Sequence, residues 1–82
     1  MELVTLTEKL IKALVINKDL VSVKEFDTDE ENTVLIQVMV DSNDIGRVIG
    51  KAGKMAKAIR TLVQATAFNK GINRVKINID SF

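Results

Sequence analysis

Four residues near the middle of the chain, Gly50-Lys51-Ala52-Gly53, combine two glycines and a cation at a spacing that suits phosphate binding. Glycine permits positive φ angles and places no side chain between the backbone and a phosphate oxygen. If a helix starts just after this segment, its first amides also have no partner within the helix. The spacing therefore predicts a loop that holds the backbone of a polyanion.

Positive charge is concentrated around this segment. The cations nearest to it are Arg47, Lys51, Lys54, Lys57 and Arg60. Residues 1–46 carry four lysines against ten carboxylates, a net charge of −6, whereas residues 47–82 carry eight basic residues against one carboxylate, a net charge of +7. This asymmetry indicates an anion-binding face in the second half. The alternative for the charge asymmetry is that the two halves of the domain attract each other electrostatically. The alternative for the glycines is a tight turn between two helices that needs small residues and binds nothing.

Several kinds of chemistry are disfavoured by composition. The chain has no cysteine and no histidine, which removes disulfides, the usual zinc ligands and the commonest general base. The segment from Gly46 to Ala52 superficially resembles a nucleotide-binding phosphate loop. However, three residues separate its glycines where that motif needs four, and Ala52 stands where Ser or Thr would hold magnesium. We therefore expect that the protein is not an enzyme, has no catalytic residue, and binds neither a metal nor a cofactor.

Length and hydropathy suggest one packed domain over residues 1–82. The apolar fraction of 46% is ordinary for a globular domain. No segment reaches the roughly 18–20 apolar residues that a membrane helix requires, and the N-terminus lacks the pattern of a signal peptide. We expect a cytoplasmic protein without a membrane partner.

Hydrophobic periodicity predicts an amphipathic helix in the first segment. Thr5 to Glu8 fits a capping box, and Asn17 is a plausible stop. The positions expected to face the core are Leu6, Leu10, Ala13 and Leu14. Alternating residues then predict strands near 20–27 and 33–40, joined by an acidic hairpin loop at 27–32.

The second half begins with a helix-start cluster in which Asp44 suits the positive end of a helix dipole. A short helix is predicted at about 44–49 and a long one at 54–69, with Gly71 as its C-terminal glycine. The apolar face of the long helix is expected to hold Met55, Ile59, Leu62, Val63 and Thr66. A last strand alternates Val75, Ile77 and Ile79 with polar residues.

The predicted order is helix, strand, strand, helix, helix, strand. The helical crossover between the second and third strands allows a parallel pair within a mixed sheet. We expect an α+β domain of two layers, in which three helices cover one face of a three-stranded mixed sheet.

The segment from Ile45 to Lys54 resembles the V-I-G-x-x-G motif of KH domains, and the match extends through Ala56 to Val63. The element order resembles the type II, prokaryotic arrangement of that fold. Together with the chain length, these features make the chain similar to the small bacterial single-KH proteins of the KhpA family.

The resemblance implies binding of single-stranded RNA, because KH domains clamp about four nucleotides against a G-x-x-G loop. It implies a groove between the two helices of the loop and the second strand, and a role as an RNA chaperone or post-transcriptional regulator. The implied RNA-binding residues are Arg47, Gly50, Lys51, Ala52, Gly53, Lys54, Lys57 and Arg60. It also implies a larger RNA-binding partner of the Jag (KhpB) family. Independently of the resemblance, a domain of about 80 residues without staples often gains from a second subunit, so a second copy of the chain is another possible partner.

Some points stay open at this stage. Many KH domains have a large aliphatic residue three positions after the second glycine, where this chain has Ala56. Leu35, Gln37 and Met39 belong either to the groove floor or to an ordinary exposed sheet face. A KH-fold protein-interaction or dimerisation module with little RNA affinity is the alternative function. A sheet that stacks bases on aromatics is disfavoured, because its strands offer only Phe26.

Overall fold

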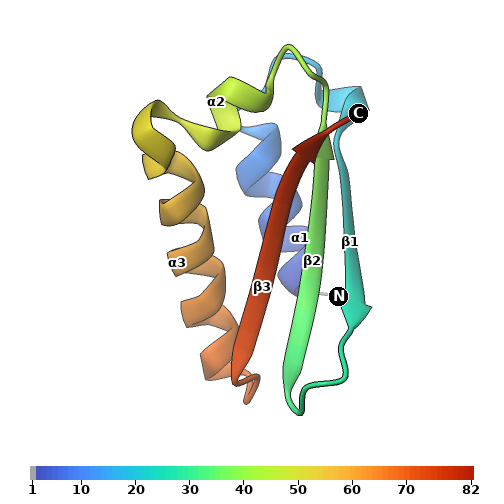
Figure 1. Cartoon of the computed structure of the whole chain (residues 1–82), viewed down its shortest axis with the longest axis vertical. Helices are drawn as coiled ribbons and strands as arrows, with labels where there is room; N and C mark the ends of the chain where they lie inside the picture. The colour runs from blue at the N-terminus through green and yellow to red at the C-terminus, as the bar shows by residue number, and fades with distance from the viewer. Residues whose placement is uncertain (1) are drawn as a thin grey trace.

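A computed structural model describes residues 2–82, and it shows a small sheet with helices on one of its faces (Figure 1). The elements in chain order are α1 (Glu2–Lys12), η1 (Lys18–Leu20), β1 (Ser22–Asp27), β2 (Thr33–Val40), α2 (Ile45–Ile49), η2 (Lys51–Gly53), α3 (Lys54–Asn69) and β3 (Arg74–Ser81). Here η1 and η2 are single 3-10 turns. This order and the two-layer α+β architecture confirm the prediction. Within residues 2–82, no helix combines the length and apolarity needed to cross a membrane.

The sheet has the strand order β1-β2-β3. β1 and β2 pair antiparallel through the hairpin, with Val23 opposite Val38. β2 and β3 pair parallel, with Ile36 opposite Ile77, because the α2–α3 crossover returns the chain to the same end of the sheet. The predicted mixed sheet is confirmed. β2 lies in the middle of the sheet and is hydrogen-bonded on both sides, so the edge strand next to α3 is β3. We expected the second strand to form one wall of the groove, and this expectation is wrong.

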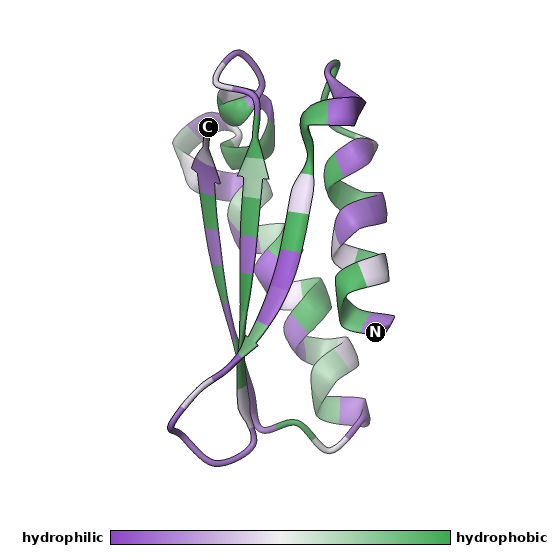
Figure 2. Cartoon of the chain, turned by 90° about the vertical axis from the view of Figure 1, so that its right-hand side faces the viewer, coloured by the Kyte–Doolittle hydropathy of each residue, from purple (hydrophilic) through white to green (hydrophobic). Residues whose placement is uncertain are grey.

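The two faces of the sheet differ as the alternation predicts. Ile36, Val38 and Val40 are fully buried under the helices. Leu35, Gln37 and Met39 alternate with them and therefore point to the opposite face. The helices of residues 2–82 all lie on the other side of the sheet and leave this face open (Figure 2). These three residues therefore belong to an open sheet face and not to the floor of a groove beside the helices.

Helix α1 begins earlier than predicted. It runs from Glu2, so Thr5 lies within the helix and the predicted capping box is wrong. The buried stripe is spaced by four residues, at Leu3, Thr7 and Ile11. The Thr7 hydroxyl is accommodated in the core because it donates to the Leu3 carbonyl at 2.7 Å. Leu6, Leu10 and Leu14, which were expected to form the centre of the buried face, are half-buried on its flank.

Helix α3 has the predicted bounds, but its buried face is rotated from the predicted one. The residues packed against the sheet are Ala56, Ile59, Val63 and Ala67. Because alanine is small, Ala56 and Ala67 let the helix pack close to the sheet. The larger side chains of Met55 and Leu62 lie beside this buried face and not within it. Met55 is 38% exposed and Leu62 is 47% exposed, which corrects their assignment to the core.

The C-terminal end of α3 follows the prediction for Gly71. This glycine has a φ of +83°. Its N–H donates to the Phe68 carbonyl at 3.1 Å, and the Ile72 N–H donates to the Ala67 carbonyl at 3.1 Å. A left-handed residue is needed to close these bonds, and glycine adopts that conformation without strain.

Candidate nucleic-acid interface

The loop at residues 50–53, hereafter the 50–53 loop, has an unusual backbone. Gly50 has a φ of +77° and Gly53 a φ of +76°, and Ala52 between them has a φ of +57°. Lys51, the remaining residue of the loop, begins the turn η2. Both glycines therefore occupy conformations that disfavour other residues.

The two glycines are required for different reasons. A Cβ on Gly50 would lie 2.6 Å from the Cβ of Met55 and 2.9 Å from its backbone nitrogen. That approach is too close for any side chain, so Gly50 lets α2 and the start of α3 meet. A Cβ on Gly53 would have no heavy atom within 4 Å, so only the backbone conformation favours glycine there. The open space around Gly53 leaves the outer side of the loop accessible.

The 50–53 loop leads directly into the N-terminus of α3. Gly53 is the N-cap residue, and no side chain caps the amides of the first turn. The Lys54 N–H is used internally, because it donates to the Lys51 carbonyl. Since α3 has 16 residues, its dipole places partial positive charge at this end. Uncapped amides at a positive helix end are suited to an anion.

Asp44 does not cap α2 with its side chain, contrary to the simplest reading of its position. Its buried carboxylate instead accepts the Ile16 N–H at 3.1 Å and the Asn17 N–H at 2.9 Å. The Asn17 backbone bond is the main cause that holds the pKa of Asp44 below its ordinary value, against the opposing effect of desolvation. Asp44 thus ties the chain after α1 to the start of α2, which precedes the loop.

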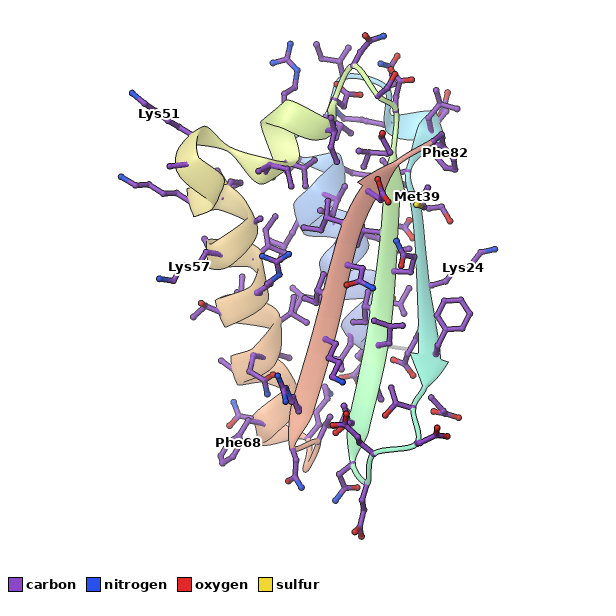
Figure 3. The ribbon with its side chains drawn as sticks, viewed as in Figure 1. Lys24, Met39, Lys51, Lys57, Phe68 and Phe82 are labelled. Carbon is purple, nitrogen blue, oxygen red and sulfur yellow. The ribbon has the colours of Figure 1, made fainter. Side chains whose placement is uncertain are left out.

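The structure gathers the predicted cations around the loop and along α3. Lys51 lies at the loop, and Lys51 and Lys57 project from the same side of the molecule (Figure 3). Lys54 begins α3 and is exposed. Arg47 lies on α2, with its Nε 3.5 Å from Oδ1 of Asp44. Arg60 lies against the edge of the sheet, because its Nε donates to the Ile77 carbonyl at 3.4 Å.

The free charge is unevenly placed. In the part of the chain that the structure describes, Lys51, Lys54 and Lys57 form no ion pair. The acidic hairpin between β1 and β2 lies at the opposite end of the molecule from the 50–53 loop (Figure 1). There Lys76 contacts Glu30 at 2.8 Å and lowers the pKa of that carboxyl. An approaching polyanion would therefore be drawn to the loop end.

Two residues on the side of α3 that faces β3 were not singled out from the sequence as site residues. Gln64 bonds to the free edge of β3, and Phe68 is 71% exposed one turn further along α3. Both follow Arg60 at steps of four residues, so the sequence alone would have placed them on the same side of the helix as this basic residue. Their partners belong to β3, which only the folded chain places beside them.

The family profile described as "KhpA/KhpB, KH domain" matches residues 4–79. The chain belongs to this family. A relative named RNA-binding protein KhpA from Caldanaerobacter subterraneus subsp. tengcongensis is 43% identical over 65 residues, which cover 79% of this chain and 84% of the relative. Another of the same name from Halalkalibacterium halodurans is 41% identical over 75 residues, covering 92% of this chain and 95% of the relative.

Solved structures agree on the fold. Era from Aquifex aeolicus bound to GDP and aluminium fluoride superimposes with a TM-score of 0.70 at 18% identity, covering 99% of this chain and 31% of that one. A complex of Era with MgGDPNP and a segment of 16S ribosomal RNA gives a TM-score of 0.70 at 19% identity, covering 98% and 30%. At this level of identity the likeness shows a shared fold and nothing more.

Proposed function

We propose that the chain binds single-stranded RNA by holding its phosphodiester backbone against the 50–53 loop. The observation that carries this proposal is the loop itself, in which two glycines with positive φ lead into the uncapped N-terminus of α3. The name RNA-binding protein KhpA, which the curated relatives carry, supports the same function.

The bound strand would continue from the loop along α3, toward the hollow between this helix and β3 that begins at Arg60. We call this path the α3–β3 groove. Lys54 and Lys57 contribute charge that no ion pair within residues 2–82 neutralises. Arg60 is held against β3 by its bond to Ile77, which presents its guanidinium at a fixed position. Gly50, Ala52 and Gly53 allow the backbone to approach, while Arg47 adds positive charge on the α2 side.

Binding of this kind suits a protein that acts on many RNAs. Contacts to phosphates carry no sequence information, and one groove holds only about four nucleotides. With two to four phosphate contacts, we expect micromolar or weaker affinity that falls as salt rises. We therefore propose a role as an RNA chaperone or post-transcriptional regulator, acting on exposed single strands. We propose that residues 1–82 form a single KH domain and that this domain carries the role.

The test replaces Lys51 and Ala52 together by aspartate. Two carboxylates at the loop would repel the phosphates, so RNA binding should be lost. Aspartate tolerates the positive φ of residue 52 better than most residues, so the fold should persist. A matched control, Lys24→Asp with Asn78→Asp on the open sheet face, makes the same change in net charge. Fluorescence anisotropy with a mixed-sequence RNA and circular dichroism read out both. Unchanged affinity in the folded loop variant would refute the loop as the RNA clamp.

A second function is favoured by an apolar hollow of about 210 Å³ between α1 and α3, which we call the α1–α3 hollow. It is lined by Leu10, Ala13, Leu14, Met55, Ala58, Ile59 and Leu62. All of these side chains are apolar, and Met55 and Leu62 expose much of their surface. A domain of about 80 residues without staples often gains stability from a second subunit.

We propose that a second copy of the chain occupies the α1–α3 hollow. The charges of α3 support an antiparallel crossing of the two α3 helices. Its cations, Lys54, Lys57 and Arg60, lie in the first half, and residues 61–69 carry no charge. An antiparallel pair therefore sets each basic half against a neutral one. A KH domain of a KhpB-type partner would compete for the same surface, and two joined grooves would bind RNA more tightly than one.

A further inference from the structure

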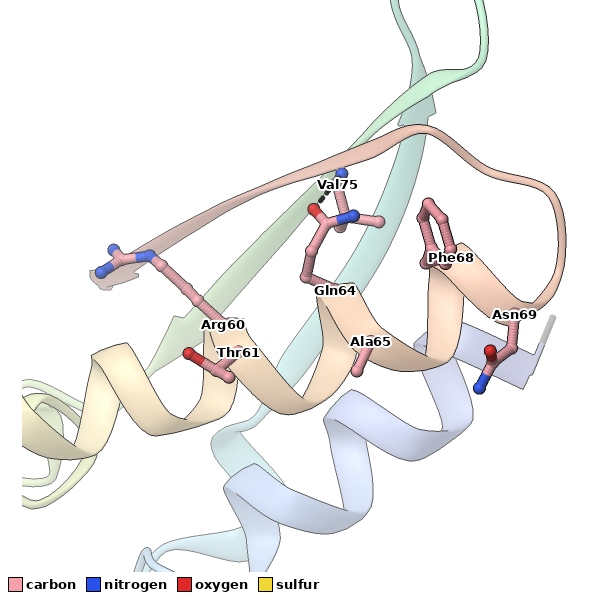
Figure 4. A pocket seen from close by; sticks show the side chains of 7 residues that line it. All are labelled: Arg60, Thr61, Gln64, Ala65, Phe68, Asn69 and Val75. Atoms are coloured by element: carbon pink, nitrogen blue, oxygen red, sulfur yellow. Dashed lines mark hydrogen bonds between the residues drawn. The ribbon is translucent and has the colours of Figure 1, made fainter.

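A hollow of about 660 Å³ lies between the C-terminal half of α3 and the start of β3 (Figure 4). Arg60, Gln64, Phe68 and Val75 are among its lining residues. We call it the distal hollow, because it lies further along α3 from the 50–53 loop. None of its lining residues is acidic, and Arg60 contributes a positive charge.

One wall of the distal hollow is fixed by hydrogen bonds to the edge of β3. The Val75 N–H donates to Oε1 of Gln64 at 2.8 Å, and Nε2 of Gln64 donates to the Asn73 carbonyl at 3.3 Å. The amide of Gln64 thus takes the place of a neighbouring strand. Since these edge groups are already used, a peptide could not add as a further strand here without displacing Gln64. The hollow is therefore better suited to a ligand that binds through its faces.

Phe68 supplies such a binding surface. Its ring is 71% exposed, and it projects from α3 on the same side as Arg60 and Gln64 (Figure 4). An exposed aromatic ring on the same side of a helix as a row of cations is a surface on which single-stranded nucleic acids stack their bases. The neighbouring Ala65 is too small to cover the ring.

The distal hollow lies on the same side of α3 as the basic residues that follow the 50–53 loop. Lys57, Arg60, Gln64 and Phe68 follow one another at steps of three, four and four residues, which places them on one side of α3. From Lys57 to Phe68 the helix rises by about 16 Å. Figure 3 shows Lys51, Lys57 and Phe68 on the same side of the molecule, with Phe68 at the far end of α3. A strand that leaves the loop along this stripe reaches the distal hollow.

We propose that the distal hollow is an additional subsite for one nucleobase of the bound RNA strand, which stacks on Phe68. The inference rests on the proposed RNA binding at the 50–53 loop. It extends the footprint beyond the about four nucleotides that a G-x-x-G loop clamps. Stacking accepts any base, so the subsite adds affinity for longer single strands without adding a sequence preference. Arg60 lies two turns before Phe68, a rise of about 12 Å along the helix. Its guanidinium, with one of its five donors used on Ile77, can therefore pair with a phosphate between the loop and the stacked base.

The test compares RNA strands of about four and about eight nucleotides, because only the longer strand can span the loop and the distal hollow. The wild-type chain should bind the longer strand more tightly. Phe68→Ala should weaken binding of the longer strand about 5- to 100-fold and leave the shorter strand unchanged. Phe82→Ala is the matched control, because Phe82 is 65% exposed and lies at the end of β3 away from the distal hollow (Figure 3).

A spectroscopic readout separates stacking from a general loss of binding. The chain contains no tryptophan, so Phe68→Trp introduces a single reporter. Its fluorescence should be quenched by the longer strand, its affinity should match the wild type, and the shorter strand should not quench it. Equal loss of both strands in Phe68→Ala, or no loss of either, would overturn the subsite. If the wild type bound neither strand, the proposed function itself would fail, which is a different result.

Discussion

Helix α3 presents chemically different flanks to its two neighbours. Toward α1 it shows Met55, Ala58 and Leu62, which carry no hydrogen-bonding group. Toward β3 it shows Arg60, Gln64 and Phe68, of which the first two bond to the strand. The buried stripe between the flanks contains two alanines and is narrow. Because only a narrow stripe of α3 packs against the sheet, both flanks of the helix are left for the two proposed partners, RNA and a second copy of the chain.

The two flanks would allow the proposed binding of RNA and the proposed self-association to take place on separate surfaces of α3. A contact on the α1 flank leaves the β3 flank and the 50–53 loop open, so a dimer would keep both of its grooves accessible. The cations lie at the loop end and on the β3 side, where a polyanion would meet them. Substitutions on one flank should then leave the function of the other unchanged.

The largest effect is expected for Leu62→Glu on the α1 flank. A carboxylate buried without a partner at the proposed dimer contact should weaken self-association by at least about 100-fold. Phe26→Glu is the matched control, because Phe26 on the open sheet face is 48% exposed and Leu62 is 47% exposed. Light scattering across a concentration series measures the association, and binding of a four-nucleotide RNA should not change. If the wild type stayed monomeric, or if both variants behaved alike, the α1–α3 hollow would not be the dimer contact.

A smaller effect is expected for Lys57→Ala on the basic side of α3. Loss of one phosphate contact should reduce RNA affinity several-fold and lower the slope of log K against log salt by about 0.7. Self-association should be unchanged, because the α1–α3 hollow is lined by other residues. Lys9→Ala on the exposed face of α1 serves as the control. Salt titrations of both variants decide the matter, and an unaltered slope for Lys57→Ala would assign this lysine to a plain solvated face.

The smallest effect on RNA binding and on self-association is expected for Asp44→Asn, because this substitution changes the stability of the fold and neither flank of α3. Asp44 joins the chain after α1 to the segment that leads into α2, and an amide cannot accept both the Ile16 and Asn17 bonds equally well. We expect a lower melting temperature at pH 7, with modest and parallel losses in RNA binding and association. Asp41→Asn is the nearby control, because its carboxylate accepts from the side chain of Asn17 in an exposed position.

The pH dependence of this effect has a defined sign. The folded pKa of Asp44 is lowered, so its contribution to stability is complete above the ordinary aspartate pKa of about 4 and is lost as pH falls through the folded value. The difference in melting temperature between the wild type and Asp44→Asn should therefore be full at neutral pH and shrink below about pH 4. A difference that stayed constant with pH would mean that the ionised carboxylate is not what stabilises the fold.

Much of the fold follows from local pattern. The strand at Thr33–Val40 and the helix at Lys54–Asn69 were predicted with their observed bounds, because strict alternation and an uninterrupted helical segment are strong signals. The start of α1 was predicted wrongly, since Thr5 to Glu8 fits a capping box equally well inside a helix. The candidate RNA site remains a prediction, but its glycines do have the positive φ that the spacing suggested.

The 50–53 loop, the cations around it and the order of the elements could be predicted from the sequence, because these features depend on residues close together in the chain. Which flank of α3 faces which neighbour became known from the packing of the folded chain. Apolar residues from Met55 to Ala67 cover a broad arc of the helix, and periodicity does not say which part of that arc meets the sheet. The bonds of Asp44 to Ile16 and Asn17, and of Gln64 to Val75, likewise join segments whose nearness is set by packing. The groove beside β3 exists for the same reason, since the parallel crossover places that strand at the edge next to α3.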